Sequence, residues 1–511
     1  MEPYIFRKNT TIGNLDAETD SFLTDCFYET EIYKTLINYD NDDNLDFTKR
    51  IIIGRTGSGK TALLKQIAID RKITKHDVIE AENTVFEHIK NNIFISQLME
   101  EDVDLRVFYK SLWLHVLLVK VINLLYPSNN FFDFLSNLTS VKKRYNLDLA
   151  RQYVDTYQDN FFNENIVSEI TDKMQNEISG GFSSGGAKLS GKFSGETSEK
   201  IQRETASYVS RELLRKQKEL IKLIKDESSS EKQVRIIISI DDLDKSWLSS
   251  SKIRYDFINA LLEAFKELLD IKSVKILISI RTDIIMGIYN NSLRQEEKDQ
   301  SLILPITWNK VEIRKILDNR INFLIKHQYR GTQNVTFKDV FNFNVIDENA
   351  DDFILNRTML RPRDAINFVN LCLSEGDGSI ELNEDLVIEA EEKFYYSRKL
   401  ALEKEWVSIY SQIHCYLDSI SFISKQTFKI SDISKDQILN YILENSEDNI
   451  KDDYHDKVAL IFEELVKVWF VIGVIGIKKT KTLTMYSSFE KPYLDITDFK
   501  KEFEIHPLFY R

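Results

Sequence analysis

Eight residues near the start of this chain constrain its fold more than any other stretch. A short β-branched run, Ile51–Ile53, leads into the motif Gly54-Arg55-Thr56-Gly57-Ser58-Gly59-Lys60-Thr61, and Ala62 opens a helix-forming tail. Glycines at this spacing let backbone N–H groups curl around phosphates, and the following helix adds the positive end of its dipole. Strand, loop and helix together form the P-loop pattern, so Gly54–Ala62 are predicted to bind a nucleoside triphosphate.

Two side chains of the P-loop have separate predicted roles. Lys60 is expected to reach the β- and γ-phosphates, and Thr61 to offer its hydroxyl to Mg²⁺. We therefore predict ATP and Mg²⁺ as cofactors, although the motif does not distinguish ATP from GTP.

Acidic residues follow a second apolar run, Val234–Ile240. A P-loop needs a carboxylate that holds Mg²⁺, usually through water, and a group that aligns the attacking water. Asp241 is our metal candidate and Asp242 our catalytic candidate, with Asp244 as the alternative for either role. The competing interpretation is that these acids only cap the next helix.

A third apolar run, Val274–Ile280, ends in Arg281-Thr282-Asp283. An arginine at the tip of a strand beside the Mg²⁺ strand can stabilise the charge that develops on the γ-phosphate. Arg281 is the first candidate for this role and Thr282 the second. Alternatively, Arg281 forms only an ion pair with Asp283.

Two arginines flank a proline at a predicted helix start, in Leu360-Arg361-Pro362-Arg363-Asp364. Basic residues there oppose the helix dipole, so another group is expected to compensate them. A bound triphosphate would do so, with Arg361 or Arg363 acting as a sensor in cis or as a finger in trans. Pairing with Asp364, or with an acid such as Asp352, is the alternative.

The composition limits the partners. The net charge of −13 argues against a nucleic-acid coat or an anionic membrane surface. The apolar stretch Leu112–Tyr126 is interrupted by polar residues and is shorter than the ~20 residues of a membrane span. Three distant cysteines indicate neither zinc nor disulfides. These features predict a cytoplasmic protein without membrane contact.

The pattern along the chain predicts four regions. Residues 1–50 carry one or two amphipathic helices, and 51–305 form an α/β core whose further strand is expected at Ile93–Ile95. Residues 306–400 are predicted to form a helical lid. In 401–511, helices at Leu402–Leu417 and Val458–Phe470 precede strands at Gly473–Ile477, Thr482–Ser487 and Glu502–Ile505, which is typical of a winged-helix-like domain.

An insertion is expected inside the core at about 128–232. It contains six glycines between positions 180 and 195, within which Ala187–Ser194 alternate apolar and polar side chains. The alternation favours a projecting β-hairpin that contacts a partner or a second copy. A flexible linker without a role is the alternative.

The motifs at 54–61, 241–244, 279–283 and 360–364 together resemble the STAND and KAP branch of P-loop ATPases. They are most similar to bacterial members found in defence loci. The resemblance implies an ASCE/AAA+-like parallel sheet core, a helical lid and a winged-helix-like tail, in which the nucleotide state controls assembly or an effector. No glutamate that could act as the base follows Asp241, so hydrolysis is expected to be slow.

The leading prediction is an ATP-dependent regulatory switch in bacterial anti-phage defence. It is expected to form a homo-oligomer and to control a separate effector, such as a nuclease or toxin. The alternative is a DNA-binding ATPase similar to origin-recognition or transposition helpers, with DNA contacting residues 473–487 through Lys478, Lys479 and Lys481. A third class is a nucleotide-binding scaffold without turnover.

Overall fold

The computed structural model divides the chain into two compact units. The lid unit comprises residues 1–30, 54–62 and 305–511, and the sheet unit comprises 31–53 and 63–304. The structure describes residues 6, 9–38, 47–81, 104–126, 141–157, 202–203, 206–207, 209–228, 235–241, 243, 251–291, 296–330, 333–407, 409–446 and 462–511. The predicted strand at Ile93–Ile95, the glycine-rich segment at 180–195 and much of the predicted insertion lie outside these residues.

A five-stranded sheet has the order β2-β3-β4-β1-β5. The register pairs Lys75 with Ile236 and Ile236 with Val274, all in parallel. The predicted apolar runs are confirmed as β3 and β4, because strands buried on both faces appear as continuous apolar sequence. The strands are β1 (Ile51–Gly54), β2 (Lys75–Glu80), β3 (Ile236–Asp241), β4 (Val274–Arg281) and β5 (Ile303–Pro305).

Strand β2 was not predicted from the sequence. Its sequence, KHDVIE, is mostly polar, and most of its residues are partly or fully exposed. A strand at the edge of a sheet, as β2 is, shows no continuous apolar run.

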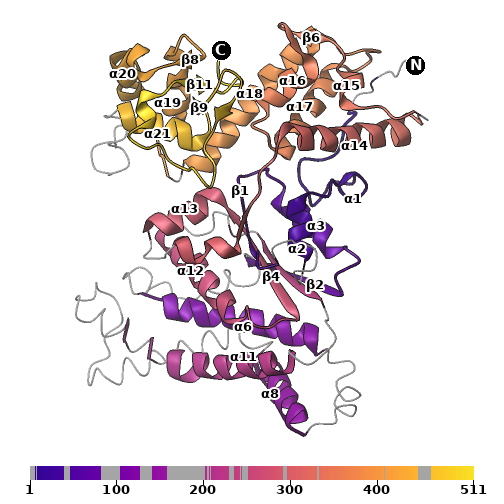
Figure 1. Cartoon of the computed structure of the whole chain (residues 1–511), viewed down its shortest axis with the longest axis vertical. Coiled ribbons are helices and arrows are strands. Elements are labelled where there is room, and N and C mark those ends of the chain that lie inside the picture. Colours follow the sequence, from indigo (N-terminus) through magenta and orange to yellow (C-terminus); the bar gives the residue numbers. More distant parts are fainter. Residues whose placement is uncertain are drawn as a thin grey trace, which may run out of the picture. The chain divides into compact units, whose positions relative to one another are not determined.

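Helices cover the sheet unit, and α6 (Arg106–Leu125) and α12 (Ser251–Glu267) pack against each other (Figure 1). The Trp113 indole N–H donates to the Phe257 carbonyl across this contact at 3.2 Å. Among the described residues, α6 is the one helix long and apolar enough for a membrane span, yet 67 % of its most apolar window is buried. It packs as a core helix.

The remaining helices that lie wholly or mostly in the sheet unit are α2 (Glu31–Ile37), α3 (Lys60–Ala68), α8 (Val141–Tyr157), α11 (Arg215–Ser228) and α13 (Thr282–Asn291), with a π-helix at Ser210–Leu214 and 3₁₀ turns at Glu296–Lys298 and Gln300–Leu302.

Within the lid unit, a helical bundle follows the sheet strands in sequence. Its first helix begins at a capping box, in which the Glu312 backbone N–H donates to the Asn309 side chain and the Asn309 backbone N–H donates to the Glu312 carboxylate. The helices are α14 (Lys310–Gln328), α15 (Phe337–Val340), α16 (Ala350–Arg357), α17 (Pro362–Glu375) and α18 (Glu384–Trp406), with a small hairpin of β6 (Asn344–Val345) and β7 (Glu348–Asn349).

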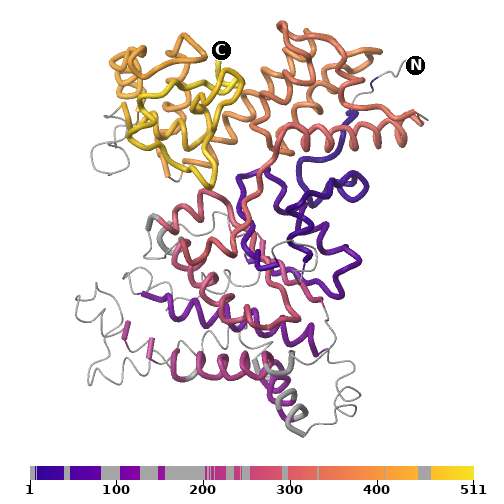
Figure 2. Tube along the Cα trace, viewed as in Figure 1, coloured from indigo at the N-terminus to yellow at the C-terminus, as the bar shows by residue number. Residues whose placement is uncertain are grey.

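The N-terminal residues run beside this bundle (Figure 2). The sequence predicts one or two helices in residues 1–50, and the structure describes α1 (Leu23–Cys26) and α2 there. Residues 12–22, which we call the N-terminal arm, are irregular. The carboxylates of Asp16 and Asp20 accept backbone N–H groups two residues on, at 3.0 and 3.2 Å, and such local bonds compete with a helix.

The end of the chain forms an antiparallel sheet with the order β10-β9-β11-β8. In chain order, this region contains a helix, a strand, two helices and then a β-ribbon, and its assignment as a winged-helix-like domain stays a prediction. The predicted helix Leu402–Leu417 is wrong in extent, because α18 ends at Trp406 and a new helix begins at Ile413. The elements are α19 (Ile413–Asp418), α20 (Lys435–Asn445), α21 (Phe462–Ile472), β8 (Thr427–Phe428), β9 (Ile475–Lys478), β10 (Thr484–Met485) and β11 (Phe503–Ile505), with 3₁₀ turns at Ser419–Phe422, Ile430–Asp432 and Asp498–Lys500.

Candidate nucleotide site

The P-loop connects β1 to α3, as its sequence predicts. Gly57 and Gly59 adopt φ of +79° and +92°, which other residues rarely tolerate. The Lys60 ammonium folds over the loop and donates to the carbonyls of Gly54 and Arg55 at 3.0 and 3.3 Å. The cation predicted to meet the phosphates therefore lies against the loop itself.

Three successive P-loop carbonyls accept hydrogen bonds from groups that lie far along the chain. The Arg361 guanidinium donates to the Thr56 carbonyl at 3.2 Å, and the Arg363 backbone N–H donates to the Gly57 carbonyl at 3.3 Å. The Trp308 indole donates to the Ser58 carbonyl at 2.9 Å. Each peptide plane directs its N–H opposite to its carbonyl, so the N–H groups of Gly57 and Gly59 point away from these donors.

This arrangement fits the phosphates of a nucleoside triphosphate. Inward N–H groups at glycines of positive φ form an anion-binding concavity. The Thr56 and Ser58 hydroxyls are buried and have no hydrogen-bond partner among the residues that the structure describes. Buried polar atoms of this kind normally require one, and a bound anion would supply it. Thr61, in the first turn of α3, remains the candidate for the Mg²⁺ ligand.

Arg361 belongs to a buried cluster of four charges in the lid unit, the Arg361 cluster. Its guanidinium lies 3.5 Å from the Glu405 carboxylate, and Arg398 contacts Glu405 and Asp364 at 3.4 and 3.0 Å. Burial lowers the pKa of Arg361, and the charge of Arg398 lowers it further. Arg361 therefore braces the loop through the Thr56 carbonyl while acids compensate its charge. The predicted pairing with Asp352 is not observed, since that carboxylate contacts Arg314.

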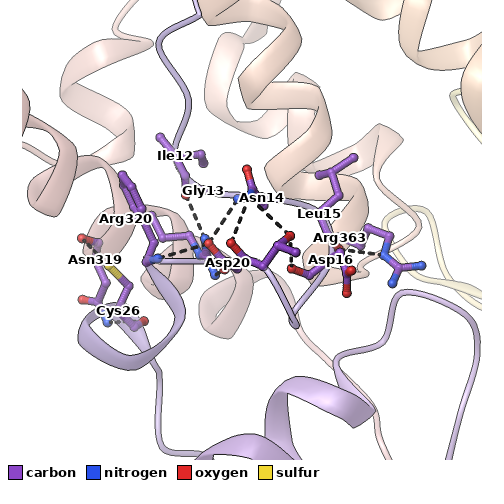
Figure 3. Close-up of polar contacts among 12 residues, drawn as sticks. Ile12, Gly13, Asn14, Leu15, Asp16, Asp20, Cys26, Asn319, Arg320 and Arg363 are labelled. Atoms are coloured by element: carbon purple, nitrogen blue, oxygen red, sulfur yellow. Dashed lines mark hydrogen bonds and ion pairs between the residues drawn. The ribbon is translucent and has the colours of Figure 1, made fainter. Parts of the chain in front are cut away.

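Arg363 is placed differently from Arg361. Its side chain is exposed, and its Nε donates to the Leu15 carbonyl of the N-terminal arm at 3.1 Å (Figure 3). A Cβ atom at Gly57 would lie 3.0 Å from the Cβ of Arg363, so the two backbones touch closely. Of the two predicted arginines, Arg363 has the exposed cationic end beside the P-loop.

The turn before Arg361 is strained. Met359 and Leu360 have φ of +48° and +49°, in the left-handed region that costs ordinary residues about 1–2 kcal/mol each. Such strain persists where the surroundings over-determine the backbone, and it is common at ligand sites. Here the strained turn delivers Arg361 and Arg363 to adjacent carbonyls of the P-loop.

The arm is anchored to the lid helices by the buried ion pair of Arg320 and Asp20, at 2.6 Å (Figure 3). Arg320 also donates to the Ile12 carbonyl at 2.8 Å. Gly13 has φ of +114°, and a Cβ there would lie 2.2 Å from the Arg320 guanidinium. The carbonyl of Leu15 is therefore held in place where Arg363 reaches it.

In the sheet unit, the predicted catalytic side chains follow β3 and β4. Asp241 ends β3 and is half-buried, while Asp242 and Asp244 lie outside the described residues. Arg281 ends β4 and forms a bidentate pair with Asp283, both bonds at 2.9 Å. The ion pair named in the alternative interpretation is thus observed, and the catalytic role of Arg281 stays a prediction. In the strand order, β4 separates β1 from β3, so Arg281 follows the strand between the P-loop strand and the Asp241 strand.

Comparison with protein families gives two matches. Residues 32–328, more than half of the chain, match the KAP family P-loop domain. The chain belongs to the KAP family. Residues 311–403 of this KAP-family chain also match the FunZ-associated C-terminal helical domain, which covers α14 to α18. No curated protein matches the chain. The predicted resemblance to KAP ATPases is confirmed, and the relation to STAND proteins and to defence loci stays a prediction.

Sequence reasoning missed several residues of this KAP-family site. Trp308, Glu405 and Arg398 carried no motif, because their partners lie 34 to 250 positions away or within a helix that appears ordinary in sequence. The side chain of Arg55 was also missed, since P-loops are defined by backbone contacts. Its guanidinium donates to the carbonyls of Val471 and Ile472 at 2.5 and 3.0 Å.

The predicted DNA contact region, 473–487, is only partly basic on its surface. Lys478 is 18 % exposed and pairs with Glu504 at 2.9 Å, whereas Lys479 and Lys481 are exposed. On the preceding helix α21, Glu463 pairs with Lys435, and Glu464 pairs with Lys467. The charged side chains of α21 are Glu463, Glu464 and Lys467, and its other residues are apolar.

Proposed function

We propose that this KAP-family protein binds and hydrolyses ATP as a regulatory switch. The observation that carries the proposal is the bracing of three consecutive P-loop carbonyls by Arg361, Arg363 and Trp308. A nucleotide that reshapes this loop must also disturb its contacts to the lid helices.

Different residues of the chain have different roles in the proposed reaction. Lys60 and the inward N–H groups of Gly57 and Gly59 bind phosphate oxygens, and Thr61 and Asp241 would hold Mg²⁺, which supplies charge neutralisation when bound. Asp242 orients or deprotonates the attacking water. Arg281 stabilises developing charge only after it leaves Asp283, and this exchange of partners keeps turnover slow.

The wider role follows from the family resemblance. The switch forms a homo-oligomer and controls a separate effector, such as a nuclease or toxin, in bacterial anti-phage defence. The match of α14 to α18 to a named associated helical domain supports a lid that serves a purpose beyond covering nucleotide. Phage challenge of cells carrying the wild-type chain or Lys60→Ala tests this role, and equal plaque counts would refute it.

The nucleotide site is tested by Lys60→Ala. Two charge-assisted hydrogen bonds are lost, so affinity for a fluorescent ATP analogue should fall about 100-fold. Lys65→Ala is the matched control, because Lys65 is an exposed lysine on the same helix. Asp242→Asn should bind normally but release no phosphate over hours. A wild-type chain that binds ATP without releasing phosphate would instead be a scaffold.

DNA contact is the second candidate function, supported by the exposed Lys479 and Lys481. A duplex should then bind with an affinity that falls with salt, and Lys479→Ala with Lys481→Ala should lower the salt slope by about two. Lys500→Ala is a suitable control, as it is exposed on the same domain. No binding at 50 mM salt would exclude this candidate.

A further inference from the structure

The C-terminal end of α21 lacks internal partners for two of its carbonyls. The helix ends in a Schellman motif, with the N–H of Gly473 donating to the Phe470 carbonyl and that of Val474 to the Trp469 carbonyl, both at 3.0 Å. The next two carbonyls are those of Val471 and Ile472. Both accept from the Arg55 guanidinium, so a P-loop residue caps this helix.

The cap matches the chemistry of a helix end. A guanidinium presents paired donors in a rigid fork, and a cation at a helix C-terminus complements the negative end of the dipole. Gly473 has φ of +86°, and a Cβ there would lie 2.7 Å from the Arg55 Nη1 atom. Glycine is thus required both by the backbone and by the space that Arg55 occupies.

The same residue is tied to the Lys60 ammonium. The carbonyl of Arg55 accepts from Lys60 at 3.3 Å and from the Ser58 N–H at 3.1 Å. When Lys60 turns toward phosphate oxygens, the Arg55 carbonyl loses a charged donor. The peptide between Arg55 and Thr56 then keeps the weaker, uncharged bond from the Ser58 N–H, and a rotation of this peptide would shift the Arg55 side chain at the end of α21.

We propose that Arg55 couples nucleotide occupancy to the C-terminal domain. The clamp of Arg55 on α21 is closed without nucleotide, and a bound triphosphate loosens it. Strand β9 begins three residues after α21. A movement of the loosened helix end therefore also moves the start of β9 in the antiparallel sheet of this domain. The inference rests on the proposed nucleotide site and adds its route of output.

Hydrogen exchange on the full chain tests the coupling, with and without Mg²⁺ and a non-hydrolysable ATP analogue. The analogue should slow exchange in 54–62 and speed exchange in 466–478. Protection at 54–62 with no change at 466–478 overturns the coupling alone. No change in either segment means that nucleotide does not bind, and both proposals then fail.

Arg55→Ala should open the clamp permanently. Exchange at 466–478 should be fast without the analogue and should not rise further with it. Because the analogue no longer works against the clamp, the variant should bind it about fivefold more tightly. A variant that keeps the full nucleotide response, or binds more weakly, contradicts the proposal.

Gly473→Ala disrupts the same contact at the α21 end. It tests the proposal even if Arg55→Ala does not fold. Its added methyl displaces the guanidinium, so it should reproduce the lost response at 466–478. Lys467→Ala is the matched control, because Lys467 lies on α21 and pairs only locally with Glu464 among the contacts described. This control should respond to the analogue as the wild type does.

Discussion

The P-loop and the strand ends that carry Asp241 and Arg281 are held in opposite ways. Each carbonyl from Gly54 to Ser58 accepts a hydrogen bond, three of them from lid-unit residues beyond position 305. Arg281 instead pairs with a neighbour two residues away. The loop is thus shaped by distant parts of the chain, whereas the strand-end charge is compensated locally.

On the proposed function, the two regions serve regulation and chemistry respectively. A loop that is hydrogen-bonded at many points responds to any movement of its partners, so it suits signalling. Arg281 must leave Asp283 before it can act, so this pair suits a catalytic step that is delayed until the site is complete. Breaking contacts in each region should therefore have different consequences.

The largest expected effect comes from Arg361→Ala. It leaves Glu405 and Asp364 buried with only Arg398, and an uncompensated buried charge costs about 3–5 kcal/mol of unfolding free energy. Urea unfolding measures the loss. Arg363→Ala is the control, because its exposed side chain should cost less than about 0.5 kcal/mol.

A double variant sharpens this test. Arg361→Met with Glu405→Gln removes one charge of each sign, so most of the stability should return while the Thr56 carbonyl stays unbraced. If the double variant is as unstable as Arg361→Ala, charge compensation is not what makes Arg361 important.

The next effect concerns turnover. Arg281→Gln should lower phosphate release about 100-fold, corresponding to ~2.7 kcal/mol of transition-state stabilisation, with nucleotide affinity unchanged. Asp283→Asn should raise turnover, since it weakens the pair that withholds Arg281. Single-turnover assays with saturating ATP measure both. A fall in affinity rather than rate would show that Arg281 only shapes the site.

The smallest effect is expected from pH. Burial lowers the pKa of His115 in the sheet unit to about 3, and burial with nearby arginines lowers the pKa of His506 in the lid unit to about 3. Unfolded histidine titrates near 6.5, so the stabilisation is complete above that pH and falls as pH drops toward 3. Each residue should cost about 1.4 kcal/mol on going from pH 7.5 to 5.5.

Replacing one of the two histidines distinguishes the pH dependence of the lid unit from that of the sheet unit. His506→Gln should weaken the pH dependence of unfolding in the lid unit. The pH dependence of unfolding in the sheet unit, measured through Trp113 or by hydrogen exchange of α6, should stay as in the wild type. Equal flattening in both units would mean that they unfold as one.

The sequence predicted the parts of this fold that depend on local pattern. Strands β3 and β4 lie within two residues of their predicted ends, because strands buried on both faces appear as continuous apolar runs. The prediction of one or two helices in residues 1–50 did not locate the irregular arm, where the Asx bonds of Asp16 and Asp20 compete with a helix.

The P-loop was also predicted from its local sequence pattern. The hydrogen bonds that its carbonyls accept from distant residues were not predicted. Arg361 carries a recognisable motif, yet its placement depends on Glu405, and nothing in the sequence of α18 marks that acid. Arg55 depends on a helix end 417 positions away. Contacts at such separations follow from the assembled tertiary structure and leave no local periodicity.

The 417 positions between Arg55 and this helix end also impose a delay during biosynthesis. At the ~5–20 residues per second of translation, about 20–80 s pass between the synthesis of Arg55 and of the helix end it caps. The P-loop of a growing chain is therefore synthesised long before the helix end that Arg55 caps. On our proposal, a chain truncated before α21 has no such contact and cannot pass the nucleotide state to the C-terminal domain.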